Sequence, residues 1–201
     1  MARWLKRFPI PEESPARHVR DLRLTFGAYR RAPEKFFEYT LWFTNMEKIT
    51  LFGHGESQPS RIPSYARLPQ SVTSLAIYTH TISLVQIRDI MVQLPNLDDL
   101  SLSGSLVAAD RNTSPGIGAA LRGRFGGQLR LLEECADTDV INMLLEVPTG
   151  LRFVEVQIHG TYEHLSSAAG LAEACGNTLV KLSYVITIHG KSFLFSWVHG
   201  F

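Results

Sequence analysis

Histidine and glycine residues give this chain its best opportunities for metal or nucleotide chemistry. Seven histidines are present, and none has the His-Glu-x-x-His spacing that places two imidazoles on one helix face to bind zinc. His159 and His164 flank Gly160, so we interpret their segment as a turn rather than a metal site. Gly116 and Gly118 match the first two glycines of a dinucleotide-binding loop, but the third is missing and no strand is expected directly before them. These spacings favour a chain without catalytic residues, cofactor or metal.

Two further features could carry chemistry. Cys135 and Cys175 are too few for a disulfide-stapled secreted domain, and we interpret them as buried, reduced thiols, with a metal pair or a disulfide as alternatives. An enzyme remains the rival hypothesis: a hydrolase or nucleotide-dependent protein that uses His54 with Glu56, or the loop at Gly116. Convergence of such groups in one deep pocket would support that rival.

The overall composition is that of an ordinary globular protein. The chain has 201 residues, of which 45% are hydrophobic and 19% charged, which is enough for one domain with a substantial core. A net charge of +1 gives no reason to expect nucleic acid as a partner. No apolar run is long enough to span a membrane, and no secretory signal is recognisable. We therefore expect no membrane association and a cytoplasmic or nuclear location.

A short apolar pattern, apolar-x-x-apolar-x-apolar, recurs seven times along the chain. A typical copy is Leu97-Asp-Asp-Leu100-Ser-Leu102. The copies begin at positions 19, 46, 72, 97, 126, 151 and 179, so the steps between them are 27, 26, 25, 29, 25 and 28 residues. This spacing is typical of leucine-rich repeats. One copy would mean little, whereas seven in near-regular register predict seven parallel strands that share one core.

Parallel strands require crossovers, and the gaps between the copies are long enough to hold helices. Helices are predicted over 32–43, 83–94, 115–121, 137–147 and 165–175, from apolar residues at helical spacing and from start and stop signals. The segment 53–67 lacks such a period and is interpreted as a loop. Gly176 and Asn177 form a stop signal after the last helix.

The strand face opposite the core would be the binding surface. Because side chains alternate along a strand, the residues between the inward apolar positions should line this face. Aromatic residues on a rigid sheet are frequent binding hot spots, and we single out Tyr78 and Phe153. Adjacent copies should also place Asp21 beside Lys48 and Arg130 beside Glu155. The predicted partner-binding residues are Arg23, Thr50, Phe52, Tyr78, Asp99, Ser101, Arg130, Phe153, Glu155 and Gln157.

The seven copies, and phrases such as Leu94-Pro95-Asn96-Leu97-Asp98-Asp99-Leu100-Ser101-Leu102, resemble the leucine-rich-repeat region of F-box proteins, particularly the divergent fungal kind. The resemblance covers about residues 18–186 and implies an α/β, right-handed solenoid with helices and loops on its convex side. It also implies a non-catalytic module that recognises a protein substrate for ubiquitination. In that family a separate N-terminal F-box contacts the ubiquitin-ligase scaffold, and no complete F-box is present here.

The resemblance divides the chain into three parts. Residues 1–17 are predicted to be a truncated F-box remnant or a disordered extension, 18–186 the solenoid, and 187–201 an irregular tail. Because 187–201 does not resemble the polar cap that ends most solenoids, a truncated remnant without function is the alternative interpretation.

Overall fold

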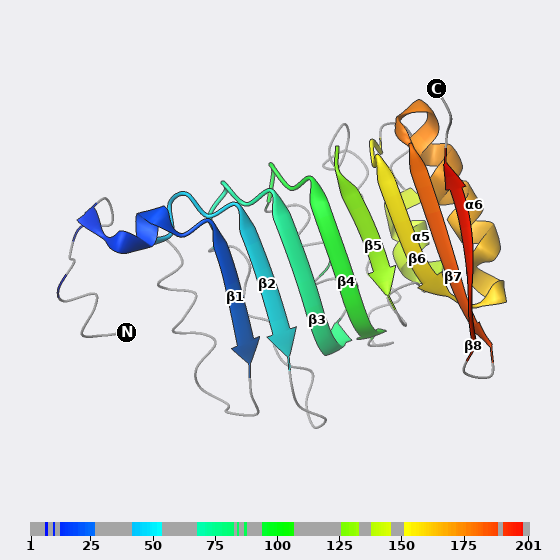
Figure 1. Ribbon diagram of the computed structural model, residues 1–201, viewed down its shortest axis with the longest axis horizontal. Helices are drawn as coiled ribbons and strands as arrows, with labels where there is room; N and C mark the ends of the chain where they lie inside the picture. Colours follow the sequence, from blue (N-terminus) through cyan, green and yellow to red (C-terminus); the bar gives the residue numbers. More distant parts are fainter. Residues whose placement is uncertain are drawn as a thin grey trace.

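The computed structural model shows one mixed sheet of eight strands that follow one another in chain order (Figure 1). It describes residues 7, 10, 13–26, 42–53, 68–82, 84, 87, 94–106, 126–132, 138–145, 151–188 and 191–198. The strands β1 to β7 are parallel to their neighbours, and β8 is antiparallel to β7. The strands are β1 Asp21–Phe26, β2 Lys48–Gly53, β3 Ser74–Ile82, β4 Asp99–Leu106, β5 Gln128–Leu132, β6 Glu155–Gly160, β7 Lys181–Ile188 and β8 Lys191–Val198.

The seven predicted strands are thus confirmed as a parallel array, with one correction of register. Across the array Leu100 pairs with Leu129, and Leu129 pairs with Val156. The sixth copy of the repeat therefore begins at Phe153 and not at Leu151, and the steps after position 97 become 29, 27 and 26 residues. The shift of two residues explains why Phe153 is fully buried, at 0% exposure, instead of lying on the open face.

The turns before β2, β3, β4, β6 and β7 are joined to the previous repeat by a recurring pair of hydrogen bonds. The backbone N–H groups of Thr73 and Ser74 both donate to the carbonyl of Glu47, at 2.9 and 3.0 Å. One repeat later, those of Asp98 and Asp99 donate to the carbonyl of Thr73, at 2.8 and 2.9 Å. These bonds satisfy backbone groups that lie outside the strand ladder, and they fix the register of neighbouring repeats.

The core lies behind one face of the sheet, where the inward residues of successive strands form continuous rows. One row runs through Ile49, Leu75, Leu100, Leu129 and Val156, each at most 1% exposed. Burying a side chain of this size contributes about 1.5–3 kcal/mol, so these rows are the main source of stability.

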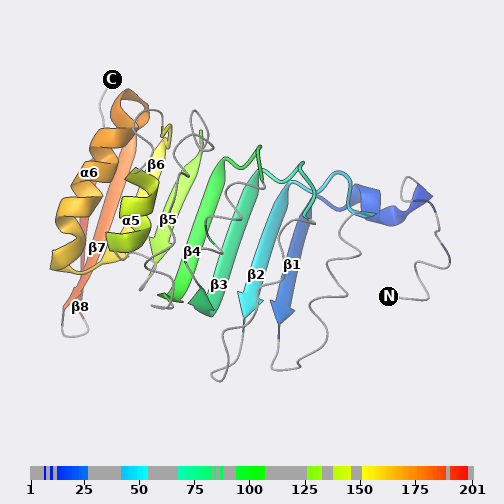
Figure 2. The same cartoon turned by 180° about the vertical axis from the view of Figure 1, so that it is seen from behind.

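Two helices cover the core behind the later strands (Figure 2). The helix α5 spans Thr138–Leu145 and α6 spans Leu165–Cys175, in agreement with the helices predicted over 137–147 and 165–175. The helix α6 ends at Gly176, whose φ of 52° is readily adopted by glycine. The other three predicted helices and the predicted loop lie mostly or wholly outside the described residues. No helix in the described ranges combines the length and apolar character needed to cross a bilayer.

Both ends of the chain contribute more to the fold than the sequence predicts. Residues Pro15–His18 form a short 3-10 helix, η2, and Ala16 is 1% exposed within the core. Residues 191–198, expected to be part of an irregular tail, form β8. The sequence contained a signal for this strand, since Phe193, Phe195 and Trp197 fall within a short apolar segment, and aromatic residues are enriched in strands.

The burial of Cys175 in the core can be tested through the pH dependence of the free energy of unfolding. Its side chain is buried, and burial raises the pKa of the thiol from 9.0 to about 11, although a backbone hydrogen bond with Phe153 acts in the opposite direction. As the pH rises, the thiol ionises at a lower pH in the unfolded chain than in the folded protein. The stability that the buried thiol contributes is therefore complete below pH 9.0 and is lost as the pH rises towards 11. The expected loss of unfolding free energy is about 3 kcal/mol.

Urea unfolding at several pH values measures this loss, and Cys175→Ala is the matched control. The variant should lose less stability than the wild type between pH 9 and 11. A smaller dependence should remain, because burial also raises the pKa of Tyr184. Identical pH dependence in both proteins would contradict a buried, protonated Cys175.

Candidate binding face

The sheet face that turns away from α5 and α6, seen in Figure 1, is called the open face here. The register of the strands and the alternation of side chains place three parallel rows of outward residues on it. The first row holds the residues at the strand starts, the second the residues two positions later, and the third the residues four positions later. The rows exist because each strand starts at the same position of the repeat. Each row therefore brings together residues that are about 26 positions apart in the sequence.

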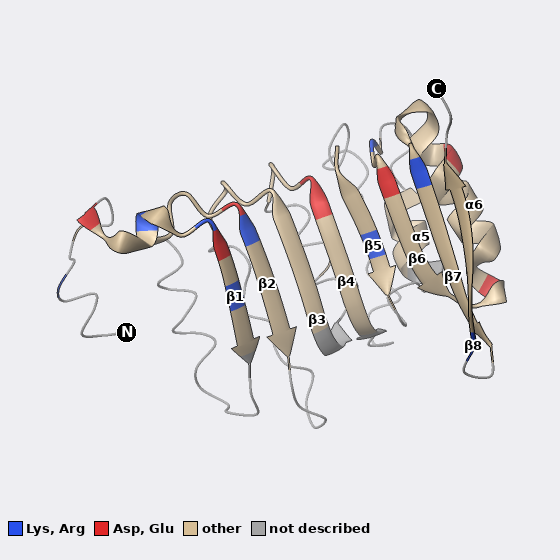
Figure 3. Ribbon diagram, viewed as in Figure 1, with Lys and Arg blue, Asp and Glu red and all other residues tan. Residues whose placement is uncertain are grey.

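Charged residues gather in the first row, at the beginnings of the strands (Figure 3). Asp21 is beside Lys48, as predicted, although the ion pair of β1 joins Asp21 to Arg23 at 3.8 Å. Glu155 is beside Gln128 and Lys181, and its carboxylate contacts the Lys181 ammonium at 2.7 Å. The prediction that Arg130 lies beside Glu155 is wrong, because the two-residue shift in β6 places Arg130 beside Gln157.

A chain of polar contacts connects β5, β6 and β7 across this face. Gln128 donates from its amide nitrogen to Glu155 at 2.9 Å, and its amide oxygen accepts a hydrogen bond from Arg130 at 2.9 Å. With the ion pair between Lys181 and Glu155, four side chains support one another. Among the described residues, the Arg130 guanidinium uses one of its five N–H groups in this series of contacts, which leaves donors that can face a ligand.

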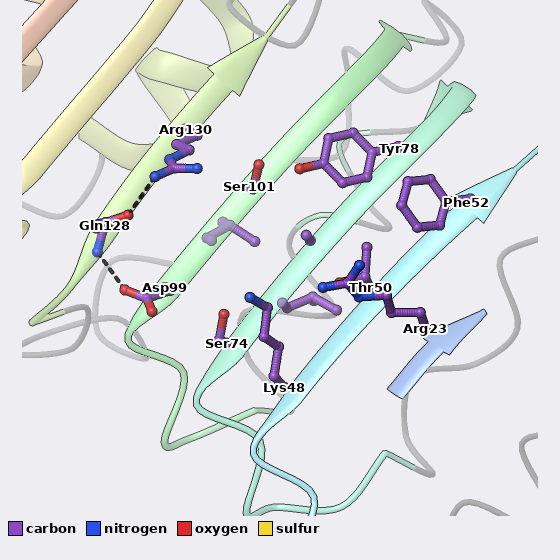
Figure 4. Close-up of a pocket in the computed structure, with 13 residues that line it drawn as sticks. Arg23, Lys48, Thr50, Phe52, Ser74, Tyr78, Asp99, Ser101, Gln128 and Arg130 are labelled. Carbon is purple, nitrogen blue, oxygen red and sulfur yellow. Dashed lines mark hydrogen bonds between the residues drawn. The ribbon is translucent and has the colours of Figure 1, made fainter. Parts of the chain in front are cut away.

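Asp99 has a structural role that the sequence does not reveal. Its carboxylate accepts a hydrogen bond from the backbone N–H of Gln128 at 2.7 Å, so it anchors the start of β5 (Figure 4). A Cβ atom added at Gly127 would meet the same carboxylate, so glycine is needed there for close approach. The negative charge of Asp99 is therefore already partly satisfied within the protein.

Two aromatic rings form the third row over β2 and β3. Phe52 and Tyr78 are direct neighbours in the sheet, and their rings are stacked with centroids 5.2 Å apart and planes 13° apart. Both side chains are partly exposed. The stack fixes two large apolar surfaces on rigid strands, so little conformational entropy is lost when a ligand covers them.

A hollow of about 380 Å³ lies between this aromatic pair and the charged first row. Its floor includes Thr50, which is 6% exposed, and Ser101, whose hydroxyl is buried and has no hydrogen-bond partner among the described residues. Figure 4 shows side chains from β1 to β5 around it. The predicted residues that line it are Arg23, Thr50, Phe52, Tyr78, Asp99, Ser101 and Arg130.

Three predicted site residues lie elsewhere. Glu155 and Gln157 are on the open face of β6, outside the hollow, and Phe153 is in the core. The alternation of residues also places Leu132 and His159 in the third row, where the sequence analysis did not expect them. His159, interpreted above as part of a turn, lies within β6 and its ring nitrogen contacts Gln157 at 2.9 Å. Continuing the two-residue alternation to the end of each strand would have identified both.

The residues of the rival enzyme hypothesis, His54, Glu56 and the Gly116 loop, lie outside the described residues. Within the described part of the chain, no three histidine, cysteine or acidic side chains gather into a group that could hold a metal ion. Comparison of the chain with protein-family models and with curated proteins finds no match.

Proposed function

We propose that this chain is a non-catalytic protein-recognition module that binds a segment of a partner protein in the hollow of the open face. The observation that carries the proposal is the stacked pair of Phe52 and Tyr78, partly exposed beside the hollow. Aromatic side chains held on a rigid surface are the residues that most often dominate the energy of a protein interface. We further propose that the sheet is part of a right-handed, leucine-rich-repeat-like solenoid, an architecture that offers such a surface.

The charges around the hollow favour a partner segment with an acidic side chain. Arg23, Lys48 and Arg130 line it, whereas Asp99 is the one acidic residue among the described residues of its lining and is already bonded to the backbone of β5. A carboxylate of the partner could accept hydrogen bonds from the guanidinium groups and from the Ser101 hydroxyl. An apolar or aromatic residue next to it would cover the ring stack. Binding should then weaken as the salt concentration rises.

The resemblance to the repeat region of F-box proteins extends the proposal to a process. In this extended proposal, the chain selects a substrate protein for ubiquitination in the cytoplasm or nucleus, and a ubiquitin-ligase scaffold is its second partner. Support for this step is the repeat pattern alone. Recovery of such a scaffold together with the wild-type chain would favour it.

The experiment compares proteins captured from the native cell by the wild type, by Tyr78→Ala and by Tyr162→Ala. Tyr162 is 62% exposed and lies outside the hollow, so it controls for the loss of an exposed tyrosine. We expect a partner that Tyr162→Ala retains and Tyr78→Ala loses. With the purified partner, Tyr78→Ala should weaken binding by about 2 kcal/mol or more, or roughly thirtyfold in Kd. Equal affinity of all three proteins would overturn the proposal.

A further inference from the structure

The last strand of the sheet carries large apolar side chains that are exposed on both of its faces. Every residue of β8 is exposed, including Leu194 at 65%, Phe195 at 56% and Val198 at 62%. Single exposed apolar residues are common on protein surfaces, but a contiguous apolar strand marks an interaction surface. The hollow of the open face involves β1 to β5, so β8 is a separate feature.

The pairing of β8 explains why its side chains are uncovered. Phe195 pairs with Tyr184 and Phe193 pairs with Ile186, so these two phenylalanines continue the wall whose inward residues form the core. Tyr184 and Ile186 are 4% and 1% exposed, whereas Phe195 and Phe193 are 56% and 48% exposed. The apolar wall therefore extends one strand beyond the segments that cover it.

The outer edge of β8 is also unprotected. Among the described residues, β8 pairs with β7 alone, so one row of its backbone N–H and C=O groups faces away from the sheet. Edge strands are usually blunted by charges, proline or bulges. β8 contains one charged residue, Lys191, at its first position, whereas the opposite edge strand β1 carries Asp21 and Arg23. The edge of β8 is therefore suited to pairing with another strand.

We propose that β8 pairs with β8 of a second copy of this chain, antiparallel and about a two-fold axis, so that two sheets join into one. Antiparallel self-pairing can place Phe195 opposite its counterpart and Phe193 opposite Trp197, with these side chains on one face. It also keeps the two Lys191 residues at opposite ends of the interface. Such a contact is self-complementary, so it closes at the dimer and does not propagate into a filament.

The exposed area is sufficient for a specific but dissociable dimer. An aromatic side chain can bury about 150–250 Å², and half of that remains exposed on each aromatic of β8. With Leu194 and Val198, each copy offers roughly 500 Å² of side-chain surface, to which the paired backbone adds. Edge pairing covers the flanks of these side chains and leaves their outer faces open, so the total stays below about 1,200 Å², in the range of weak and transient interfaces. We therefore expect a dimer that dissociates on dilution.

Sedimentation equilibrium of the purified chain over a wide concentration range tests the proposal. The wild type should shift reversibly between the masses of one and two chains. Phe195→Lys should raise the dimer dissociation constant at least tenfold, because it places two like charges at the axis. Tyr162→Lys, which adds the same charge at an exposed aromatic outside β8, should leave the constant unchanged. Circular dichroism verifies that each variant is folded.

A second variant keeps the test decisive if Phe195→Lys fails to fold. Leu194→Lys alters the opposite face of β8 and should weaken the dimer in the same direction. A wild type that stays monomeric, or one that grows beyond the dimer, overturns the proposal. So does a folded β8 variant that dimerises like the wild type. Because β8 is remote from the hollow, Phe195→Lys should still bind the partner of the open face.

Discussion

Replacement of Phe153 with alanine is expected to lower the free energy of unfolding by about 3–5 kcal/mol. Phe153 is 0% exposed and belongs to the core cluster, directly before β6. Removing its ring would leave a cavity, because the surrounding strands are fixed by their hydrogen-bond ladder and collapse only in part. Urea unfolding measures the loss, with an unchanged m-value as evidence that the unfolding transition is comparable.

Phe52→Ala is the matched control, since it removes the same ring from the open face. Phe52 is partly exposed and stacks on Tyr78, so its loss should cost about 1 kcal/mol in stability. The comparison discriminates between the two registers of the sixth repeat. Similar small losses from both variants would place Phe153 on the open face, as the sequence alone suggested, and would contradict the burial described above.

The sequence predicts most of the strand register because the repeat is nearly regular. It places Phe52 beside Tyr78, since both stand at the same position of copies 26 residues apart. The sixth copy is ambiguous, because Leu151, Phe153 and Val154 all precede β6 and are all apolar. Leu151 and Phe153 are both buried, so burial does not separate them, and only pairing with β5 and β7 decides which of them begins the copy. That single error also produced the wrong neighbour for Arg130.

Features that depend on distant contacts were harder to predict. Alternation identifies Asp99 as an outward residue, but its hydrogen bond to the backbone of Gln128 depends on a close approach at Gly127. The hollow likewise requires a small residue at the centre of the second row, where Ala76 lies between Thr50 and Ser101. The strand β8 breaks the repeat, because it returns antiparallel to β7 and no crossover of the kind that joins parallel strands lies between the two.

The sheet is built from repeats that contact their neighbours in a row, so the effect of a core substitution should depend on its place in that row. Leu100 lies on β4, between Leu75 and Leu129, and is 1% exposed. Leu22 occupies the same position on the edge strand β1 and is only partly buried. Leu100→Ala should therefore cost about 2–5 kcal/mol, whereas Leu22→Ala should cost about 1 kcal/mol or less.

Urea unfolding of both variants and of the double variant tests this dependence. Three strand spacings separate the two leucines, or about 14 Å, so their effects on unfolding free energy should add. A loss from Leu22→Ala as large as that from Leu100→Ala would mean that β1 is covered as fully as the interior strands. A strongly non-additive double variant would contradict the nearest-neighbour architecture, because in a row of stacked repeats two sites this far apart share no contact through which they could be coupled.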